Sequence, residues 1–160
     1  MSKVSYYTEE GLKKLRAELD KLRDIERPKA SQAIAEARDK GDLSENAEYD
    51  AAKEKQSMLE GRIQDLENKI STAEVINPTE LQKDGRVVFG VMVTFIDLNT
   101  DEQFKYQIVG EDEANIREGK ISYVSPIARA LIGKTEDDIT EFDIPSGKRE
   151  VQIIKVEYEI

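Results

Sequence analysis

The sequence predicts an α+β protein of two parts: an N-terminal antiparallel α-helical coiled-coil hairpin over residues 1–77, and a C-terminal domain over residues 78–160. Three observations lead to this prediction. Apolar residues recur with a helical period in two long segments before Pro78, a short turn containing Gly41 separates those segments, and the apolar period changes to two after Pro78. The C-terminal domain is expected to be an antiparallel sheet with one short helix against it.

The first helical segment runs from Thr8 to about Lys40. Thr8 is suited to cap the first turn, and the two glutamates that follow it favour the positive end of the helix dipole. Four leucines then follow with 3-4-3 spacing: Leu12, Leu15, Leu19 and Leu22. Pro28 interrupts the pattern, and because a proline inside a helix costs about 3 kcal/mol, we expect a kink or local break near residues 26–28.

The second helical segment carries a regular heptad seam that the pair Asn77-Pro78 ends. Its members are Tyr49, Ala52, Gln56, Leu59, Ile63, Leu66, Ile70 and Ala73. Because only a few residues separate the two helices, they must run antiparallel. At about 1.5 Å per residue the arms reach roughly 45–50 Å, longer than a compact domain needs. The seam thins toward the turn, where Ala, Gln and Tyr replace larger aliphatic residues, so we expect local polar contacts to hold the tip.

After Pro78 three stretches read as strands: "RVVFGVMVTFIDL", "EQFKYQIVG" and "REVQIIKVEYEI". In the last of them, alternation places Ile154, Val156, Tyr158 and Ile160 on one face. The segment "SPIARALIGK" predicts a short helix, with Ser125 as the N-cap, Pro126 at the first helical position and Gly133 at the end.

Composition excludes several classes of function. The chain has 160 residues, no cysteine and no histidine, so disulfide scaffolds, thiolate nucleophiles, cysteine-ligated zinc and histidine general bases are excluded. The formal net charge of −10 argues against nonspecific attraction to naked nucleic acid or anionic lipid. Neither a signal peptide nor a run of about 20 apolar residues is present. We therefore expect a soluble cytoplasmic protein with no membrane partner.

The turn "DKGDLSENAEY" places two carboxylates, Asp42 and Glu45, three residues apart at the free end of the hairpin. One interpretation is structural: Asp-x-x-Glu is the pattern of a capping box, with Ser44 as a competing N-cap. The other interpretation is functional, because two carboxylates can bind a hard cation such as Mg²⁺ when another molecule supplies the remaining oxygen ligands. The spacing alone favours the structural interpretation.

Two separated motifs resemble the bacterial Gre transcript cleavage factor family. "AEARDKGDLSENAEYDAAKEKQ" followed by "EGRI" is similar to the tip signature of that family. "GKISYVSPIARALIGK" and the closing "IIKVEY" are similar to its C-terminal domain. The resemblance covers nearly the whole chain in collinear order. It implies an FKBP-like C-terminal domain that holds the rim of the secondary channel of RNA polymerase, while the coiled coil enters that channel in a backtracked complex.

The resemblance also implies roles for six residues. Asp42 and Glu45 match the acidic tip residues, which implies that they position a catalytic Mg²⁺ jointly with the polymerase active site. Arg38 and Lys53 match basic positions that contact the extruded RNA 3′ end, and arginine is more usual at the second position. Ser125 and Pro126 match the polymerase-docking loop, whereas Val124 stands where many members have a polar residue. Without the resemblance, Arg38 and Lys53 would be interpreted as solvated charges on the helix surface. Ser125 and Pro126 would be interpreted as the start of a helix.

The function expected from the resemblance is stimulation of RNA cleavage by the polymerase itself, which rescues arrested complexes, so the chain is not an enzyme alone. Its partners are RNA polymerase and the nascent RNA 3′ end. One alternative is a channel-binding inhibitor without cleavage activity, and another is a prolyl-isomerase-like chaperone. A generic coiled-coil adaptor would leave the acidic turn unexplained except as a cap. We expect a monomer, because the hairpin satisfies its own seam.

Overall fold

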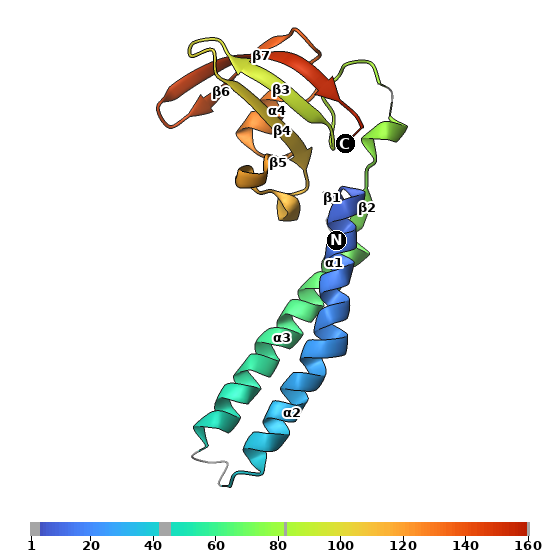
Figure 1. Cartoon of the computed structure of the whole chain (residues 1–160), viewed down its shortest axis with the longest axis vertical. Helices are drawn as coiled ribbons and strands as arrows, with labels where there is room; N and C mark the ends of the chain where they lie inside the picture. The colour runs from blue at the N-terminus through green and yellow to red at the C-terminus, as the bar shows by residue number, and fades with distance from the viewer. Residues whose placement is uncertain (1–3, 42–45, 82, 160) are drawn as a thin grey trace. The chain divides into compact units, whose positions relative to one another are not determined.

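The computed structural model describes residues 4–41, 46–81 and 83–159, and it divides into two compact units (Figure 1). One unit comprises residues 12–73, and the other comprises residues 4–11 together with residues 74–160. Packing therefore groups the first described residues with the C-terminal domain, which the sequence pattern did not indicate. Within the three described stretches, no helix has the length and apolar character needed to cross a bilayer.

The first unit is the predicted helical hairpin. One arm contains α1 (Glu9–Lys21), a π-helical segment (Leu22–Glu26) and α2 (Arg27–Arg38), and the other arm is α3 (Ala47–Ser71). Figure 1 shows the two arms side by side. Exposed ion pairs join them: Arg62 to Glu18 at 3.0 Å, Arg27 to Glu60 at 2.9 Å, and Arg23 to Glu67 at 3.3 Å. Each such pair contributes at most about 1 kcal/mol, so the apolar seam carries most of the stability.

The buried part of the seam lies in two clusters. Near the base of the hairpin, the buried side chains are Leu12, Leu15, Leu19, Ile63 and Leu66. Near the tip, Ile34 and Ala37 are also buried. On α3 the seam is buried at Ile63 and Leu66, whereas Tyr49, Ala52, Gln56 and Leu59 toward the turn are half-buried, as the sequence predicted. Alanines on both arms leave a further gap in the middle of the hairpin.

The helical break occurs just before the predicted position. In the π-helical segment Leu22–Glu26, the backbone hydrogen bond from the Arg27 N–H reaches back five residues to the Leu22 carbonyl. Pro28 then falls in the first turn of α2, where a missing N–H costs least. The chain stays helical on both sides, so the proline changes the hydrogen-bond register without ending the arm.

The second unit is built on a five-stranded sheet in the order β5-β4-β3-β7-β6. The strands are β3 (Met92–Asp97), β4 (Gln103–Val109), β5 (Lys120–Ser122), β6 (Ile139–Ile144) and β7 (Gly147–Glu157). Neighbours pair antiparallel except β4 and β5, which pair parallel. The sheet is therefore mixed, and the prediction of a purely antiparallel sheet was wrong in this respect. The sequence contains no alternating run at β5, because the strand has only three residues.

A single helix and the sheet enclose the core of this unit. The helix α4 (Pro126–Leu131) contributes Ala128 and Leu131, both fully buried. The remaining buried members are Val87, Val91, Val93, Phe95, Ile108, Ile121, Phe142, Val151, Ile153, Val156 and Tyr158. Short 3₁₀ turns occupy Pro78–Glu80, Glu111–Glu113 and Ile116–Glu118.

A β-bulge changes the predicted face of β7. Phe95 pairs with Ile153 and Thr94 pairs with Lys155, so the register shifts by one residue between them. Ile154 is the extra residue and is 40% exposed, whereas Ile153 and Val156 are both buried. The prediction that Ile154 shares the core face was wrong, because a bulge inserts one residue into the two-residue period. Val156 and Tyr158 are buried as predicted, and Ile160 lies outside the described residues.

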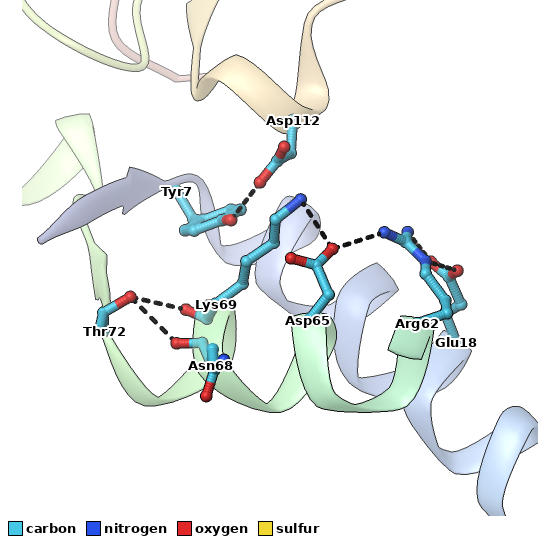
Figure 2. Close-up of polar contacts among 8 residues, drawn as sticks. All are labelled: Tyr7, Glu18, Arg62, Asp65, Asn68, Lys69, Thr72 and Asp112. Carbon is cyan, nitrogen blue, oxygen red and sulfur yellow. Dashed lines mark hydrogen bonds and ion pairs between the residues drawn. The ribbon is translucent and has the colours of Figure 1, made fainter. Parts of the chain in front are cut away.

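The N-terminal segment is tied to the C-terminal unit by polar contacts. Strand β1 (Ser5–Tyr7) forms a two-stranded sheet with β2 (Ala73–Val75), and Figure 2 shows the Tyr7 hydroxyl donating to the Asp112 carboxylate. The Glu113 carboxylate accepts from the Thr8 N–H at 3.0 Å and from the Gly110 N–H at 3.1 Å. A Cβ on Gly110 would lie 2.3 Å from the Tyr6 carbonyl oxygen, so only glycine allows this approach.

Candidate functional site

The predicted site lies at the end of the hairpin where α2 stops and α3 begins. α2 ends at Arg38, and α3 starts at Ala47 with Asn46 as its N-cap. Asp42 and Glu45, the two predicted catalytic and metal-binding residues, lie outside the described residues. Over the ranges that the structure does describe, no three acidic side chains lie close enough together to bind a metal ion.

Asn46 holds the two arms of the hairpin together at the tip. Its Oδ1 accepts from the Tyr49 N–H at 3.0 Å, and its Nδ2 donates to the Ala37 carbonyl of α2 at 2.6 Å. One side chain thus satisfies a backbone donor at the start of α3 and a backbone acceptor at the end of α2. The polar support expected for the tip is confirmed. The N-cap of α3 is Asn46, so the interpretation in which Asp42 or Ser44 caps this helix was wrong.

An exposed ion pair spans the same end of the hairpin. Lys40, two residues beyond α2, places its Nζ 2.8 Å from the Glu48 carboxylate in the first turn of α3. The hydrogen bond to Glu48, together with the charge of that carboxylate, raises the pKa of Lys40 above its usual value. Both side chains are exposed, so this pair adds little stability and mainly places opposite charges on either side of the turn.

The two predicted RNA-contacting cations lie near this tip. Arg38 is the last residue of α2, is exposed, and has no ion-pair partner among the residues that the structure describes. Lys53 is exposed on α3, with its Nζ 5.4 Å from the centroid of the Tyr49 ring. A cation over an exposed aromatic face gains about 0.5–1 kcal/mol, so Lys53 is held near Tyr49 but remains available to a stronger anion.

The predicted docking loop starts a helix in the second unit. Ser125 is the N-cap of α4, and its Oγ accepts from the Ala128 N–H at 3.2 Å. Pro126 is the first residue of α4 and is exposed. The helix start predicted from the sequence is confirmed. It gives a structural reason for a serine at position 125 and a proline at position 126. The Val124 N–H is itself satisfied by the Ser122 hydroxyl at 3.2 Å, which fixes the loop ahead of the helix.

Three aromatic rings meet beside this loop, and sequence analysis did not find them. The Tyr123 ring centroid lies 5.7 Å from that of Tyr6 and 5.6 Å from that of Phe89, both in edge-to-face geometry. Burial, and then the nearby charge of Glu111, raises the pKa of Tyr123 above its usual value. The only sequence signal is the position of Tyr123 next to Val124, because the three rings come from distant segments.

Asn46→Ala is expected to loosen the tip. The substitution removes the N-cap of α3 and the bond to the Ala37 carbonyl, which together should lower the free energy of unfolding by about 1–3 kcal/mol. Thermal unfolding followed by circular dichroism measures the change. Asn46→Asp is the matched control: it keeps the N-cap acceptor but loses the donor to Ala37, so it should recover about half of the loss. Equal stability of Asn46→Ala and the unsubstituted chain would contradict a supporting role.

Comparison with known proteins finds relatives over nearly the whole chain. Residues 5–75 match the family model "Transcription elongation factor, N-terminal", and residues 82–158 match "Transcription elongation factor, GreA/GreB, C-term". Transcription elongation factor GreA of Neisseria meningitidis is 57% identical over 94% of this chain and 96% of its own length. GreA of Alkalilimnicola ehrlichii is 53% identical over 99% of both chains. GreA factor homolog 1 of Thermus thermophilus, a solved structure, is 28% identical over 97% of this chain and 99% of its own, with a TM-score of 0.42.

Proposed function

The chain belongs to the GreA/GreB family of transcription elongation factors, and we propose from this membership that it binds RNA polymerase and stimulates the polymerase's own cleavage of nascent RNA. In this proposal the hairpin enters the secondary channel of a backtracked complex in the cell interior. The cleavage removes the extruded 3′ end of the transcript and returns an arrested complex to elongation. The chain supplies groups to the polymerase active site and is not an enzyme alone.

The observation that carries this proposal is the combination of a family match over both parts of the chain with the architecture of the tip. A long hairpin ends in a turn that joins Arg38 to Asn46. Because Asn46 caps α3, no cap of that helix requires the two carboxylates Asp42 and Glu45. Their presence between the two arms is then better explained by chemistry carried out with a partner.

Asp42 and Glu45 would hold a Mg²⁺ ion together with oxygen ligands from the polymerase. The carboxylates of these two residues suit Mg²⁺, because carboxylate oxygens are the ligands that this ion prefers. Two carboxylates leave most of its coordination positions to water and to the polymerase. When bound there, the ion would supply the Lewis acid for hydrolysis of a phosphodiester bond. The part of this chain is to bring two negative charges to the ion that the polymerase shares.

Ser125 and Pro126 would contact the channel rim of the polymerase. The exposed ring of Pro126 and the neighbouring rings of Tyr6, Phe89 and Tyr123 support this part of the proposal. Aromatic side chains are enriched in protein interfaces because they bury a large area at low entropic cost. The apolar Val124 suits an interface of this kind better than one built on polar contacts.

A stalled, backtracked RNA polymerase complex with labelled RNA and Mg²⁺ tests the proposed function. Addition of the chain is expected to release short 3′ fragments and to restore elongation when nucleotides are supplied. If the chain binds the complex but never increases cleavage, it occupies the channel as an inhibitor. The prolyl-isomerase alternative predicts peptide isomerisation by the chain without polymerase, measured in the same preparation.

Lys53→Ala is expected to weaken action on backtracked RNA. Loss of one charge-assisted contact of about 1.4 kcal/mol would raise the factor concentration needed for half-maximal cleavage about tenfold. Lys53→Arg should match or exceed the lysine, because a guanidinium can contact phosphate through two donors. Lys13→Ala, an exposed lysine of α1 far along the arm, is the control. An unchanged half-maximal concentration for Lys53→Ala would rule out this contact.

A further inference from the structure

A groove of about 500 Å³ lies along the middle of the hairpin, within the unit formed by residues 12–73. The apolar residues that line this hairpin groove are Leu22, Ala30, Ala33, Ala52 and Leu59. The charged residues that line it are Glu18, Lys21, Glu26, Lys29 and Lys55. Both arms contribute, so the groove is a feature of the folded hairpin rather than of one helix.

The groove is a local gap in an otherwise packed seam. Leu19 and Leu66 are buried on the side of the base, and Ile34 and Ala37 are buried on the side of the tip. Between these clusters Leu22 and Leu59 are only half-buried, and the alanines beside them are too small to fill the space between the arms. The π-helical segment Leu22–Glu26 lies at the same place, and such segments often occur where a helix serves a function.

Some of the charged side chains around the groove have an ion-pair partner and others do not. Glu18 is paired with Arg62 at 3.0 Å, as Figure 2 shows. In contrast, none of the three lysines Lys21, Lys29 and Lys55 has an ion-pair partner among the described residues. Within the described ranges, three unpaired lysines against the one unpaired carboxylate of Glu26 make the lining locally positive, in a chain whose formal net charge is −10. This surface is complementary to carboxylates.

We propose that the hairpin groove binds a segment of RNA polymerase whose exposed face combines aliphatic side chains with Asp or Glu. This inference rests on the proposed function, because it assumes that the hairpin reaches the polymerase. The aliphatic side chains of the partner occupy the space beside Ala33 and Ala52, and its carboxylates pair with the lysines. The groove thereby adds a contact along the arm, separate from the tip and from the docking loop.

The lining of the groove favours protein over RNA as the occupant. Among the described residues, none that lines the groove is aromatic, and nucleic-acid bases in single strands are typically bound by stacking on aromatic rings. Aliphatic side chains need no stacking partner and are well matched to leucine and alanine.

Charge reversal tests the electrostatic half of the proposal. The triple variant Lys21→Glu, Lys29→Glu and Lys55→Glu is expected to weaken binding to core polymerase by at least about tenfold, because like charges would then face one another. The control variant reverses Lys105, Lys148 and Lys155 in the sheet of the second unit, which changes the net charge equally. Affinity is measured by titrating labelled factor with polymerase, first without and then with nucleic acid.

Filling the groove tests the apolar half. Ala33→Leu combined with Ala52→Leu places larger side chains in the space and should raise the melting temperature of the hairpin, because more apolar surface becomes buried. A docking groove predicts weaker polymerase binding despite the higher stability. A mere packing gap predicts higher stability with unchanged binding, and that result would overturn the proposal.

The remaining outcomes separate the inference from the function on which it rests. If the unsubstituted chain does not bind polymerase, the proposed function fails. If it binds and stimulates cleavage while both groove variants bind equally well, only the groove inference fails. Loss of affinity that occurs only in complexes with extruded RNA would identify RNA as the occupant and overturn the proposal. A dimer in sedimentation that the lysine variant disrupts would identify a second copy of the chain and overturn it as well.

Discussion

Replacing Asp42 with asparagine and Glu45 with glutamine is expected to abolish transcript cleavage and to leave polymerase binding nearly intact. Both substitutions keep the size of the side chain and remove its charge. A neutral amide is a poor ligand for Mg²⁺, and loss of a single group that stabilises transition-state charge lowers the rate of an enzymatic reaction by about 10²–10³-fold. Loss of two such groups should lower the cleavage rate by at least about 10³-fold.

The measurement is the rate of RNA cleavage in a stalled, backtracked complex at saturating factor. Binding is measured in parallel, and circular dichroism reports whether the hairpin is intact. Because Asn46 caps α3, the double variant should unfold at nearly the same temperature as the unsubstituted chain. The matched control is Asp50→Asn with Glu54→Gln, which removes two exposed charges from α3 close to the tip. Full cleavage by the Asp42 and Glu45 variant would overturn the proposed role of these carboxylates.

Leu66→Ala is expected to destabilise the hairpin by about 2–5 kcal/mol, the range found when a large buried aliphatic side chain is truncated. Leu66 is 0% exposed and belongs to the packed cluster at the base of the hairpin. The interarm ion pairs at Glu18 and Arg23 are exposed and cannot offset this loss. The variant should also stimulate cleavage less, because a frayed hairpin cannot hold its tip in place.

Leu59→Ala is the control, because it removes the same side chain at a less buried position of the same seam. Leu59 is only half-buried and lines the groove, so its truncation should cost clearly less than that of Leu66. Chemical denaturation gives both free energies, and cleavage assays at several temperatures show whether activity follows stability. Equal losses for the two variants would contradict the expectation that the fully buried Leu66 stabilises the hairpin more than the half-buried Leu59.

The candidate site could be predicted only in part from the sequence. Asp42 and Glu45 were singled out by their spacing in a turn between two helical patterns, whereas the roles of Arg38 and Lys53 are implied only by the family resemblance. The double role of Asn46 could not be predicted, since its bond to the Ala37 carbonyl depends on how the two arms pack. The contact among the three aromatic rings beside the docking loop could not be predicted either, because the rings meet only through tertiary packing.

The elements that depend on local periodicity could be predicted from the order of residues alone. The heptad seam determined the antiparallel hairpin, and Ser125 with Pro126 determined the start of α4, since helical periodicity and caps act over a few residues. Four features became visible only in the folded chain: the parallel pairing of β5, the bulge at Ile154, the attachment of residues 4–11 to the second unit and the groove in the hairpin. These features depend on which distant segments pack together and on how completely their side chains fill the space between them, and no local pattern encodes either.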